Sequence, residues 1–259
     1  MKKEISNTEN VERDGLIYGR NAVTEALKSE RTINKLFVRS GTREGSLPMI
    51  VAIAEGMGIP IVEVTKEKLD AMTDRAAHQG VAASVAAVEY VDLDRLFEIS
   101  AERSEPPFYV IADGVEDPHN LGAVIRCAEG AGAHGVIIAK RHGALVTPTV
   151  VKASAGAIEH MAICRVVNIA ATIDKLKERG VWIYGAEADG ACLYETDLGG
   201  SAAFVVGSEG RGMSQLVRKK CDFVLSIPMY GKVNSFNVSC ASAVILCAAA
   251  NDRHKRSDK

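Results

Sequence analysis

Five polar side chains that could take part in chemistry are grouped in the second half of the chain. They are Asn120, Arg126, Glu209, Ser235 and Asn237. Among them, Arg126 supplies a permanent positive charge and a fork of hydrogen-bond donors, which suits phosphate recognition and the stabilisation of a developing oxyanion. The carboxylate, hydroxyl and amide groups can orient such a guanidinium or a substrate hydroxyl.

These side chains belong to three blocks, 113–138, 204–213 and 225–246, that share one organisation. Each block begins in an apolar strand-like run, passes through a polar loop and continues into a helix-like segment. Ligands of open α/β sheets bind at the carboxyl ends of strands, so these loops are where a site is expected. The runs FYVIAD, GVIIA, VWIYGAE, AAFVVG and FVLSIP alternate with helical stretches at 169–179, 213–220 and 235–251. This alternation predicts a parallel sheet with helices on both faces.

The rest of the chain predicts a second, smaller unit and two polar ends. Residues 14–90 contain short helices and strands, including a strand at 59–64, a helix capped by Thr65 and a closing strand at 81–88. The charged stretch that follows ends in Glu105-Pro106-Pro107, which predicts a linker. The expected organisation is a tail at 1–13, a small α/β domain at 14–90, a linker at 91–107, a larger α/β domain at 108–252, and a tail at 253–259 whose Arg253, Lys255 and Arg256 aid solubility.

Bulk properties indicate a protein without a membrane span or a metal. The chain has 259 residues and a net charge of -2, so no global basic field points to nucleic acid, although a local basic face would suffice. The six cysteines form no C-x-x-C pair and are expected as reduced core residues in the cytoplasm. The first residues lack the apolar core of a signal peptide, and the apolar run 238–250 is too short to span a bilayer. No H-x-x-x-H or Cys/His cluster supports a metal site.

One motif gives a misleading signal. Gly130, Gly132 and Gly135 spell G-x-G-x-x-G. In a dinucleotide site these glycines follow a strand and open a helix, whereas here they follow a helical segment and precede the GVIIA run. We therefore interpret them as a helix stop and turn and exclude a Rossmann dehydrogenase.

The strings DPHNLGAVIRCAEGAGAHGV, GSEGRGM and IPMYGKVNSFNVSCASAV together resemble the three motifs of the SpoU (TrmH-like) RNA ribose 2′-O-methyltransferases. LIYGRNAVTEAL and HQGVAA resemble the substrate-binding domain of the branch that modifies a guanosine of 23S rRNA. The resemblance implies an α/β-knot (SPOUT) domain with a deep trefoil knot, preceded by a small L30e-like RNA-binding domain. It also implies a homodimer with its sites at the knotted interface.

The resemblance assigns roles to particular residues. Arg126 becomes the main catalytic residue, supported by Asn120, Glu209, Ser235 and Asn237. The backbone at Gly207, Ile227 and Phe236 becomes the binding site of S-adenosylmethionine, although relatives usually carry Leu at the position of Phe236. Because a guanidinium stays protonated, we expect Arg126 to orient the nucleotide and stabilise an alkoxide rather than to act as a base.

Structural roles for the same residues stay open. Asn120, Ser235 and Asn237 could simply cap helices, and Glu209 could be a carboxylate at a helix entry. Arg126 could be a surface residue. Basic residues near the blocks could contact phosphates or form a solvated face; they are Arg211, Arg218, Lys219, Lys220 and Lys232.

The sequence thus predicts methylation of a ribose 2′-hydroxyl with S-adenosylmethionine as the cofactor. The expected substrate is a guanosine in large-subunit (23S) rRNA. Two alternatives remain: a tRNA ribose 2′-O-methyltransferase, and a non-catalytic RNA-binding factor of ribosome assembly.

Overall fold

The computed structural model describes residues 15–29, 33–41, 44–85 and 88–257. The chain divides into two compact units, of which unit 1 comprises Met1–Val88 with Val146–His160 and unit 2 comprises Glu89–Leu145 with Met161–Lys259. The tail expected at 1–13 lies outside the described residues.

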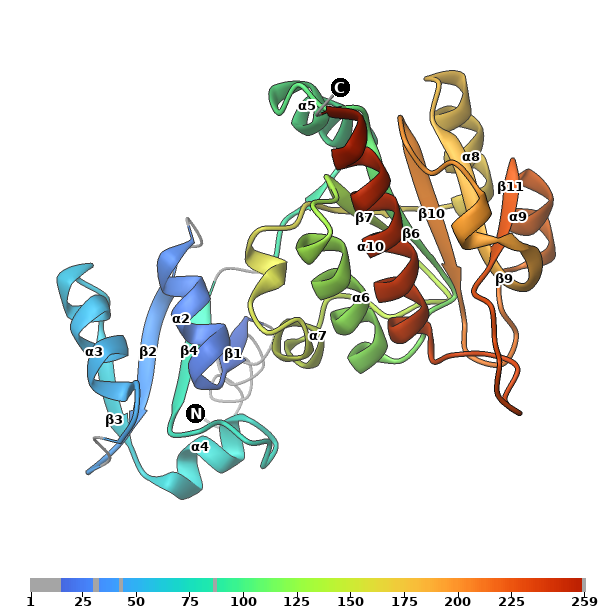
Figure 1. Cartoon of the computed structure of the whole chain (residues 1–259). Coiled ribbons are helices and arrows are strands. Elements are labelled where there is room, and N and C mark those ends of the chain that lie inside the picture. Colours follow the sequence, from blue (N-terminus) through green and yellow to red (C-terminus); the bar gives the residue numbers. More distant parts are fainter. Residues whose placement is uncertain (1–14, 30–32, 42–43, 86–87, 258–259) are drawn as a thin grey trace. The chain divides into compact units, whose positions relative to one another are not determined.

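Unit 1 is built on a four-stranded sheet of order β1-β4-β2-β3 (Figure 1). Strand β4 is antiparallel to both of its neighbours, and β2 pairs in parallel with β3. The elements of this part are β1 (Leu16–Tyr18), α2 (Arg20–Lys28), β2 (Ile33–Arg39), α3 (Leu47–Gly56), β3 (Ile61–Val64), α4 (Lys66–Met72) and β4 (Val81–Val85). The Thr65 hydroxyl accepts a hydrogen bond from the Lys68 backbone N–H at 3.3 Å, which confirms the predicted cap. The expected strand at 81–88 ends at Val85, and residues 86–87 lie outside the described ranges.

A segment from later in the chain completes unit 1. Helix α7 (Pro148–Ala153) and the turn η1 (Ala157–Glu159) pack against β1 and α2. The Lys152 ammonium lies 4.8 Å from the centre of the Tyr18 ring, and the His160 imidazole lies 3.5 Å from the Glu25 carboxylate. The sequence pattern places this segment in the 108–252 domain, because nothing local indicates which core it joins.

Unit 2 holds a seven-stranded sheet of order β11-β9-β10-β6-β7-β8-β5, and every pairing in it is parallel. Its strands are β5 (Tyr90–Val91), β6 (Phe108–Asp113), β7 (Gly135–Ala139), β8 (Ile163–Val166), β9 (Trp182–Cys192), β10 (Ala202–Gly207) and β11 (Phe223–Ser226). The central strands are buried along most of their length, as expected for continuous apolar runs. The predicted parallel α/β sheet is confirmed.

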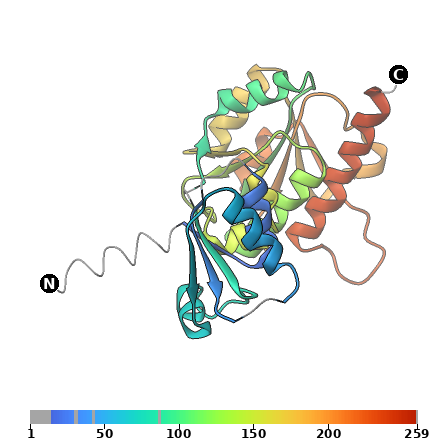
Figure 2. The same cartoon turned by 90° about the vertical axis from the view of Figure 1, so that its left-hand side faces the viewer.

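Helices cover both faces of this sheet. Figure 2 shows α5 (Leu93–Glu102) and α8 (Ile169–Glu178) on one side, with α6 (Pro118–Gly130) and α10 (Val238–Ser257) on the other. Helix α9 (Gln215–Lys220) packs on the same face as α5 and α8, because apolar residues of all three helices belong to one buried cluster with alternate residues of the strands. Helices α6 and α10, far apart in sequence, pack side by side. The trefoil knot stays a prediction, because strand order alone does not define how the chain threads.

The segment expected as a linker at 91–107 is largely helical. Leu96 of α5 is fully buried in the core of unit 2. A Cβ on Gly135 would lie 2.5 Å from the Leu96 Cδ2 atom, so the glycine lets α5 approach the sheet closely. Helix α6 ends at Gly130, Gly132 adopts a φ of +76°, and β7 begins at Gly135. The interpretation of these glycines as a helix stop and turn is confirmed.

The end of the chain corrects the expectation for Arg253. Helix α10 continues to Ser257, and the Arg253 guanidinium lies 4.9 Å from the centre of the Phe108 ring. It donates hydrogen bonds to the carbonyls of Gly200 and Pro106, each at 2.5 Å. Arg253 therefore clamps α10 to the N-terminal edge of β6 instead of serving only solubility.

All six cysteines are free thiols. Cys164 is buried as expected, whereas Cys240 and Cys247 are exposed on α10. Within the described ranges, no helix combines the length and the hydropathy that crossing a membrane requires.

Candidate functional site

Three of the five predicted catalytic side chains form one hydrogen-bonded group at the carboxyl edge of the unit 2 sheet. The Asn120 side-chain amide donates to the Glu209 Oε1 atom at 2.6 Å. The Asn237 amide also donates to Glu209 Oε1, and it lies 3.2 Å from the Asn120 Oδ1 atom, which accepts from it. We call this group the Asn120–Glu209–Asn237 cluster; it joins one residue from each of the three sequence blocks.

The beginnings of two helices position the amides of the cluster. Asp117 caps α6 by accepting from the His119 backbone N–H at 2.8 Å, so Asn120 is not the cap and lies nearly buried in the first turn. Asn237 precedes α10 and accepts from the Ser239 backbone N–H at 2.9 Å. Asn237 therefore caps a helix with its oxygen while its nitrogen serves the cluster.

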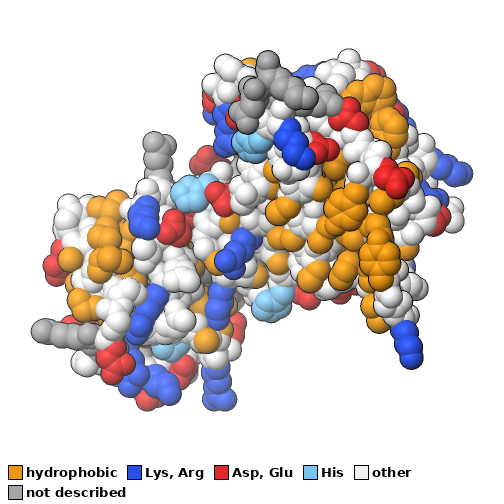
Figure 3. Space-filling view, viewed as in Figure 1, with side chains coloured by type: hydrophobic (Ala, Val, Ile, Leu, Met, Phe, Trp, Pro, Cys, Tyr) orange, Lys and Arg blue, Asp and Glu red, His pale blue; other side chains and the backbone are white. Residues whose placement is uncertain are grey.

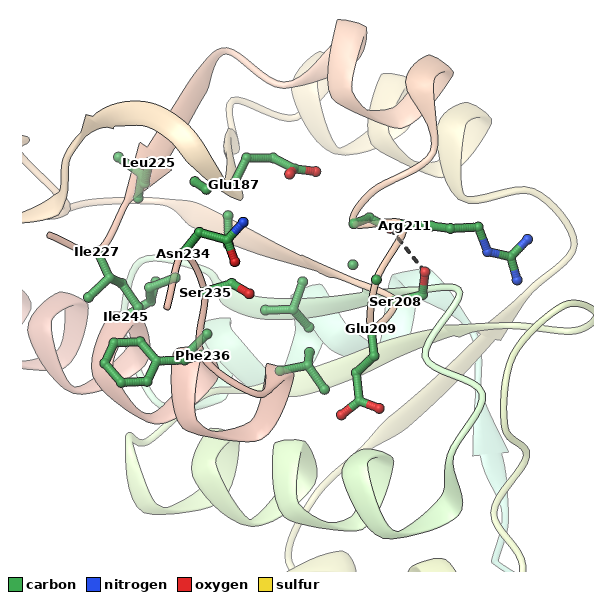
Figure 4. A pocket seen from close by; sticks show the side chains of 18 of the residues that line it. Glu187, Ser208, Glu209, Arg211, Leu225, Ile227, Asn234, Ser235, Phe236 and Ile245 are labelled. Atoms are coloured by element: carbon green, nitrogen blue, oxygen red, sulfur yellow. Dashed lines mark hydrogen bonds between the residues drawn. The ribbon is translucent and has the colours of Figure 1, made fainter. Parts of the chain in front are cut away.

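A tight turn after β10 positions Glu209. The backbone N–H and C=O groups of Ser208 pair with those of Gly212, at 3.0 and 2.9 Å. Gly210 and Gly212 have φ values of +80° and +65°, which side chains other than glycine rarely adopt. A Cβ on Gly207 would lie only 2.2 Å from the Gly212 carbonyl carbon, so the turn folds directly against the strand end. In Figure 4 the Glu209 carboxylate points away from the turn toward the α6 side.

A cavity of about 320 Å³ opens beside the cluster, and Glu209 belongs to both. The cavity is lined by residues from β9, the turn after β10, the segment after β11 and the start of α10. Apolar side chains such as Leu225, Ile227 and Ile245 lie close to the polar Asn234 and Ser235, with Glu209 across the cavity from them (Figure 4). Its volume is at the lower end of the range for small-molecule pockets, and its mixture of apolar walls with a few polar groups is typical of them.

All three predicted cofactor-binding residues line this cavity. They are Gly207, Ile227 and Phe236. Ser235 lines it as well. The Phe236 side chain is about half exposed, at 47%.

Sequence reasoning missed Glu187, which also lines the cavity. Its Oε1 atom accepts a hydrogen bond from the Met213 backbone N–H at 2.9 Å and so fixes the far end of the turn after β10. A carboxylate that directly follows the apolar run VWIYGA was the signal that could have identified it.

Arg126 is not brought to the cavity within one chain. It is exposed on α6 and is absent from the cavity lining. Six residues separate it from Asn120, which turns its side chain about 120° around the helix axis. Among the residues that the structure describes, Arg126 has neither an ion pair nor a hydrogen bond with the cluster.

The basic residues near the site fall into two groups. Arg218 and Lys220 pair with acidic residues from other elements, at 2.8 Å from Asp189 and 2.5 Å from Asp174. These ion pairs favour the interpretation of a solvated face. Arg211 forms a longer ion pair, at 3.6 Å from Glu116, and its side chain is 82% exposed. Lys232 is also exposed, so both side chains can reach a phosphate.

Taken together, the parallel sheet, the polar cluster and the cavity define an α/β protein that binds a ligand at the carboxyl edge of its sheet. The chain belongs to the SpoU rRNA methylase family, whose model matches residues 107–247. Residues 16–91 match the model for RNA 2′-O ribose methyltransferase substrate binding. The chain is therefore an RNA methyltransferase with a separate substrate-binding region, as the motif resemblance predicts.

Two similar proteins support this assignment over most of the chain, and a solved structure shares the fold. A protein of Bacillus subtilis named as the TrmH family tRNA/rRNA methyltransferase YacO is 45% identical over 231 residues, covering 89% of this chain and 92% of its own. A Staphylococcus haemolyticus protein of the same family name is 45% identical over 95% of this chain and 98% of its own. The crystal structure of the SpoU methyltransferase AviRb from Streptomyces viridochromogenes, in complex with S-adenosylmethionine, has a TM-score of 0.76 at 24% identity and covers 100% of this chain and 95% of that one.

Proposed function

We propose that this protein transfers a methyl group from S-adenosylmethionine to a ribose 2′-hydroxyl, with a guanosine of 23S rRNA as the expected target. One observation carries the proposal: Glu209 lies both in the wall of the cavity and at the centre of the Asn120–Glu209–Asn237 cluster. A ligand in the cavity and a hydroxyl at the cluster would therefore be neighbours.

The cavity suits a nucleoside-containing cofactor. Its apolar walls can cover an adenine ring, and the backbone at Gly207, Ile227 and Phe236 can bind the polar edges. The missing side chain at Gly207 lets the turn 208–213 pack against the end of β10, and this packing forms that wall of the cavity. When bound, S-adenosylmethionine supplies an electrophilic methyl group on a sulfonium, so alignment of the acceptor oxygen would provide much of the rate acceleration.

The residues of the cluster would hold the acceptor ribose and its charge. Glu209 and the two amides offer acceptors and donors for a ribose hydroxyl. A guanidinium cannot act as a base at ordinary pH, so the hydroxyl would give its proton to a nearby RNA phosphate or to solvent. Arg126 would stabilise the alkoxide that develops as this proton leaves.

A homodimer would explain the exposed position of Arg126. The α6–α10 pair presents Arg126, Cys240 and Cys247 at its surface. A second copy placed over this pair would bring one subunit's arginine toward the other subunit's cavity. The proposal therefore includes a homodimer with shared sites, located in the cytoplasm where rRNA is modified.

The substrate-binding region favours rRNA over tRNA. The Aquifex aeolicus TrmH/SpoU tRNA modifying enzyme is 27% identical and covers 63% of this chain, with a TM-score of 0.54. More than a third of this chain has no counterpart in that smaller enzyme. An additional RNA-binding region suits a large, structured substrate.

The test is methyl transfer from labelled S-adenosylmethionine to transcripts of 23S rRNA and of tRNA, followed by mass spectrometry of the nucleosides. We expect a methylated guanosine in 23S rRNA and loss of transfer in Arg126→Ala, with an unchanged fold. Transfer to tRNA alone would support the first alternative substrate. A protein that binds rRNA but not S-adenosylmethionine would instead be a non-catalytic assembly factor.

A further inference from the structure

The segment 227–237, which joins β11 to α10, carries an aromatic side chain whose position the cofactor site does not explain. Both ends of this segment line the cavity, through Met229 on one side and Asn234 on the other. Tyr230 lies between them, is not part of the lining and is 96% exposed. Its ring therefore lies outside the cavity, in solvent.

The surroundings of Tyr230 are apolar and basic. The segment contains no Asp or Glu, and Lys232 is its single charged residue. Val233 is also exposed, at 67%. In the space-filling view the segment projects from unit 2 and has a basic side chain at its end (Figure 3). Together with Phe236 at 47%, Tyr230 and Val233 group three exposed apolar side chains in one segment, and such a group beside a ligand site indicates a binding surface where a single exposed residue would not.

Exposed aromatic rings beside cations are how proteins hold unpaired RNA bases. The ring stacks on the face of a base, and the cation contacts the neighbouring phosphate. A nucleotide that places its ribose at the Asn120–Glu209–Asn237 cluster must leave its base, or the adjacent base, outside the cofactor cavity. Tyr230 provides an exposed ring in the segment that runs from the cavity wall at Ile227 to Asn237 of the cluster.

We propose that Tyr230 is a positioning residue that stacks on an RNA base at or next to the methylated nucleotide, while Lys232 contacts the adjoining phosphate. This inference rests on the proposed function and names how the same site selects its RNA. A second copy of the chain is the other possible occupant of the segment. Lysine is depleted in subunit interfaces, and Lys232 lies two residues from Tyr230, which favours RNA.

The experiment compares Tyr230→Ala, Tyr230→Phe and the control Val233→Ala, an exposed apolar residue of the same segment without a ring. Methyl transfer to 23S rRNA gives kcat and KM, and titration calorimetry gives the Kd for S-adenosylmethionine. A mobility-shift assay measures binding of the same RNA, and sedimentation gives the oligomeric state. We expect Tyr230→Ala to raise KM for RNA and weaken RNA binding about tenfold or more, the range for losing one stacked base. Tyr230→Phe and Val233→Ala should stay within about twofold of the wild type, because stacking needs only the ring.

The outcomes separate the inference from the function on which it rests. Unchanged RNA binding and KM in Tyr230→Ala, with an active wild type, would overturn the stacking role alone. A fall in sedimentation mass of Tyr230→Ala would assign the residue to a subunit interface instead. A wild type that binds RNA without methylating it would contradict the proposed function, and the mobility-shift comparison of the alanine and phenylalanine variants would still decide the role of Tyr230.

Discussion

The Glu209 carboxylate accepts a hydrogen bond from the Asn120 amide at 2.6 Å, across 89 residues of sequence. This contact ties the turn after β10 to the first turn of α6, and Asn237 connects the same carboxylate to the start of α10. Three elements that the chain forms far apart are thereby held in one arrangement at the edge of the sheet.

Glu209→Gln should lower methyl transfer without abolishing cofactor binding. Glutamine keeps the shape but replaces a charged acceptor by a neutral one, and it adds an amide that faces two other amides. Losing a charge-assisted hydrogen bond costs about 1.5–3 kcal/mol, which corresponds to a fall in kcat of roughly 10- to 150-fold. Single-turnover kinetics with saturating cofactor would measure it. Wild-type rates in this variant would show that the carboxylate is structural only.

Gly207→Ala should damage the cofactor cavity. The added Cβ would lie 2.2 Å from the Gly212 carbonyl carbon and 2.3 Å from the Met213 nitrogen, so the turn must move. Overpacking of this kind costs about 1–3 kcal/mol, and we expect the Kd for S-adenosylmethionine to rise by roughly 5- to 150-fold. Calorimetric titration measures that constant. The control is Gly130→Ala, where an added Cβ meets no atom within 4 Å. Equal affinities for S-adenosylmethionine in the two variants would show that cofactor binding does not require the close packing at Gly207.

Arg253→Ala should destabilise the fold. The variant loses the ring contact with Phe108 and hydrogen bonds to the carbonyls of Pro106 and Gly200. We expect the free energy of unfolding to fall by about 2–4 kcal/mol, from the lost charge-assisted bonds together with lost packing. Urea denaturation measures the change. Lys255→Ala on the same helix, whose side chain is 67% exposed, should change stability by less than about 0.5 kcal/mol. Similar losses of stability in both variants would contradict the stabilising role of Arg253.

A fall in pH should lower the free energy of unfolding of unit 2, because His134 becomes protonated. Burial lowers the pKa of His134 from its ordinary value of 6.5, and the positive charges of Arg103 and Arg253 act in the same direction, while Glu105 opposes them. Its Nδ1 atom accepts the Phe108 backbone N–H at 3.0 Å, a bond that protonation of that atom would remove.

Below about pH 6.5 the unfolded chain binds a proton that the folded protein resists, so stability is complete above this pH and declines as the pH falls toward the folded pKa. The slope for one proton is at most about 1.4 kcal/mol per pH unit. Unfolding free energies between pH 7.5 and 5 should show a smaller slope in His134→Gln than in the wild type. Identical slopes would exclude His134 as the titrating group.

Local signals in the sequence predicted the parts of the fold that local physics controls. Apolar runs of strand length gave the parallel sheet, Thr65 gave a helix start, and the glycines at 130–135 gave a turn. Long-range packing was not predictable in this way. Nothing in residues 146–160 indicates that they pack in unit 1, and nothing near Arg253 indicates that Phe108 and Gly200 would meet it.

The candidate site shows the same division. The motif strings led to Asn120, Glu209 and Asn237, which the structure joins, and to the cavity residues Gly207 and Ser235. Glu187 was missed because its role comes from one bond to the Met213 backbone, which depends on how β9 and the turn after β10 meet.

The most direct test of the account is to locate the transferred methyl group within the modified nucleotide. The rRNA that the purified protein has methylated is treated with alkali, which cleaves only where a free 2′-hydroxyl can attack the adjoining phosphate. The resistant position is then mapped by primer extension and mass spectrometry. The account predicts one alkali-resistant linkage that carries the labelled methyl group and that is absent after incubation with Glu209→Gln for the same short time. A methyl group found on a base, with the linkage still cleaved by alkali, would contradict it.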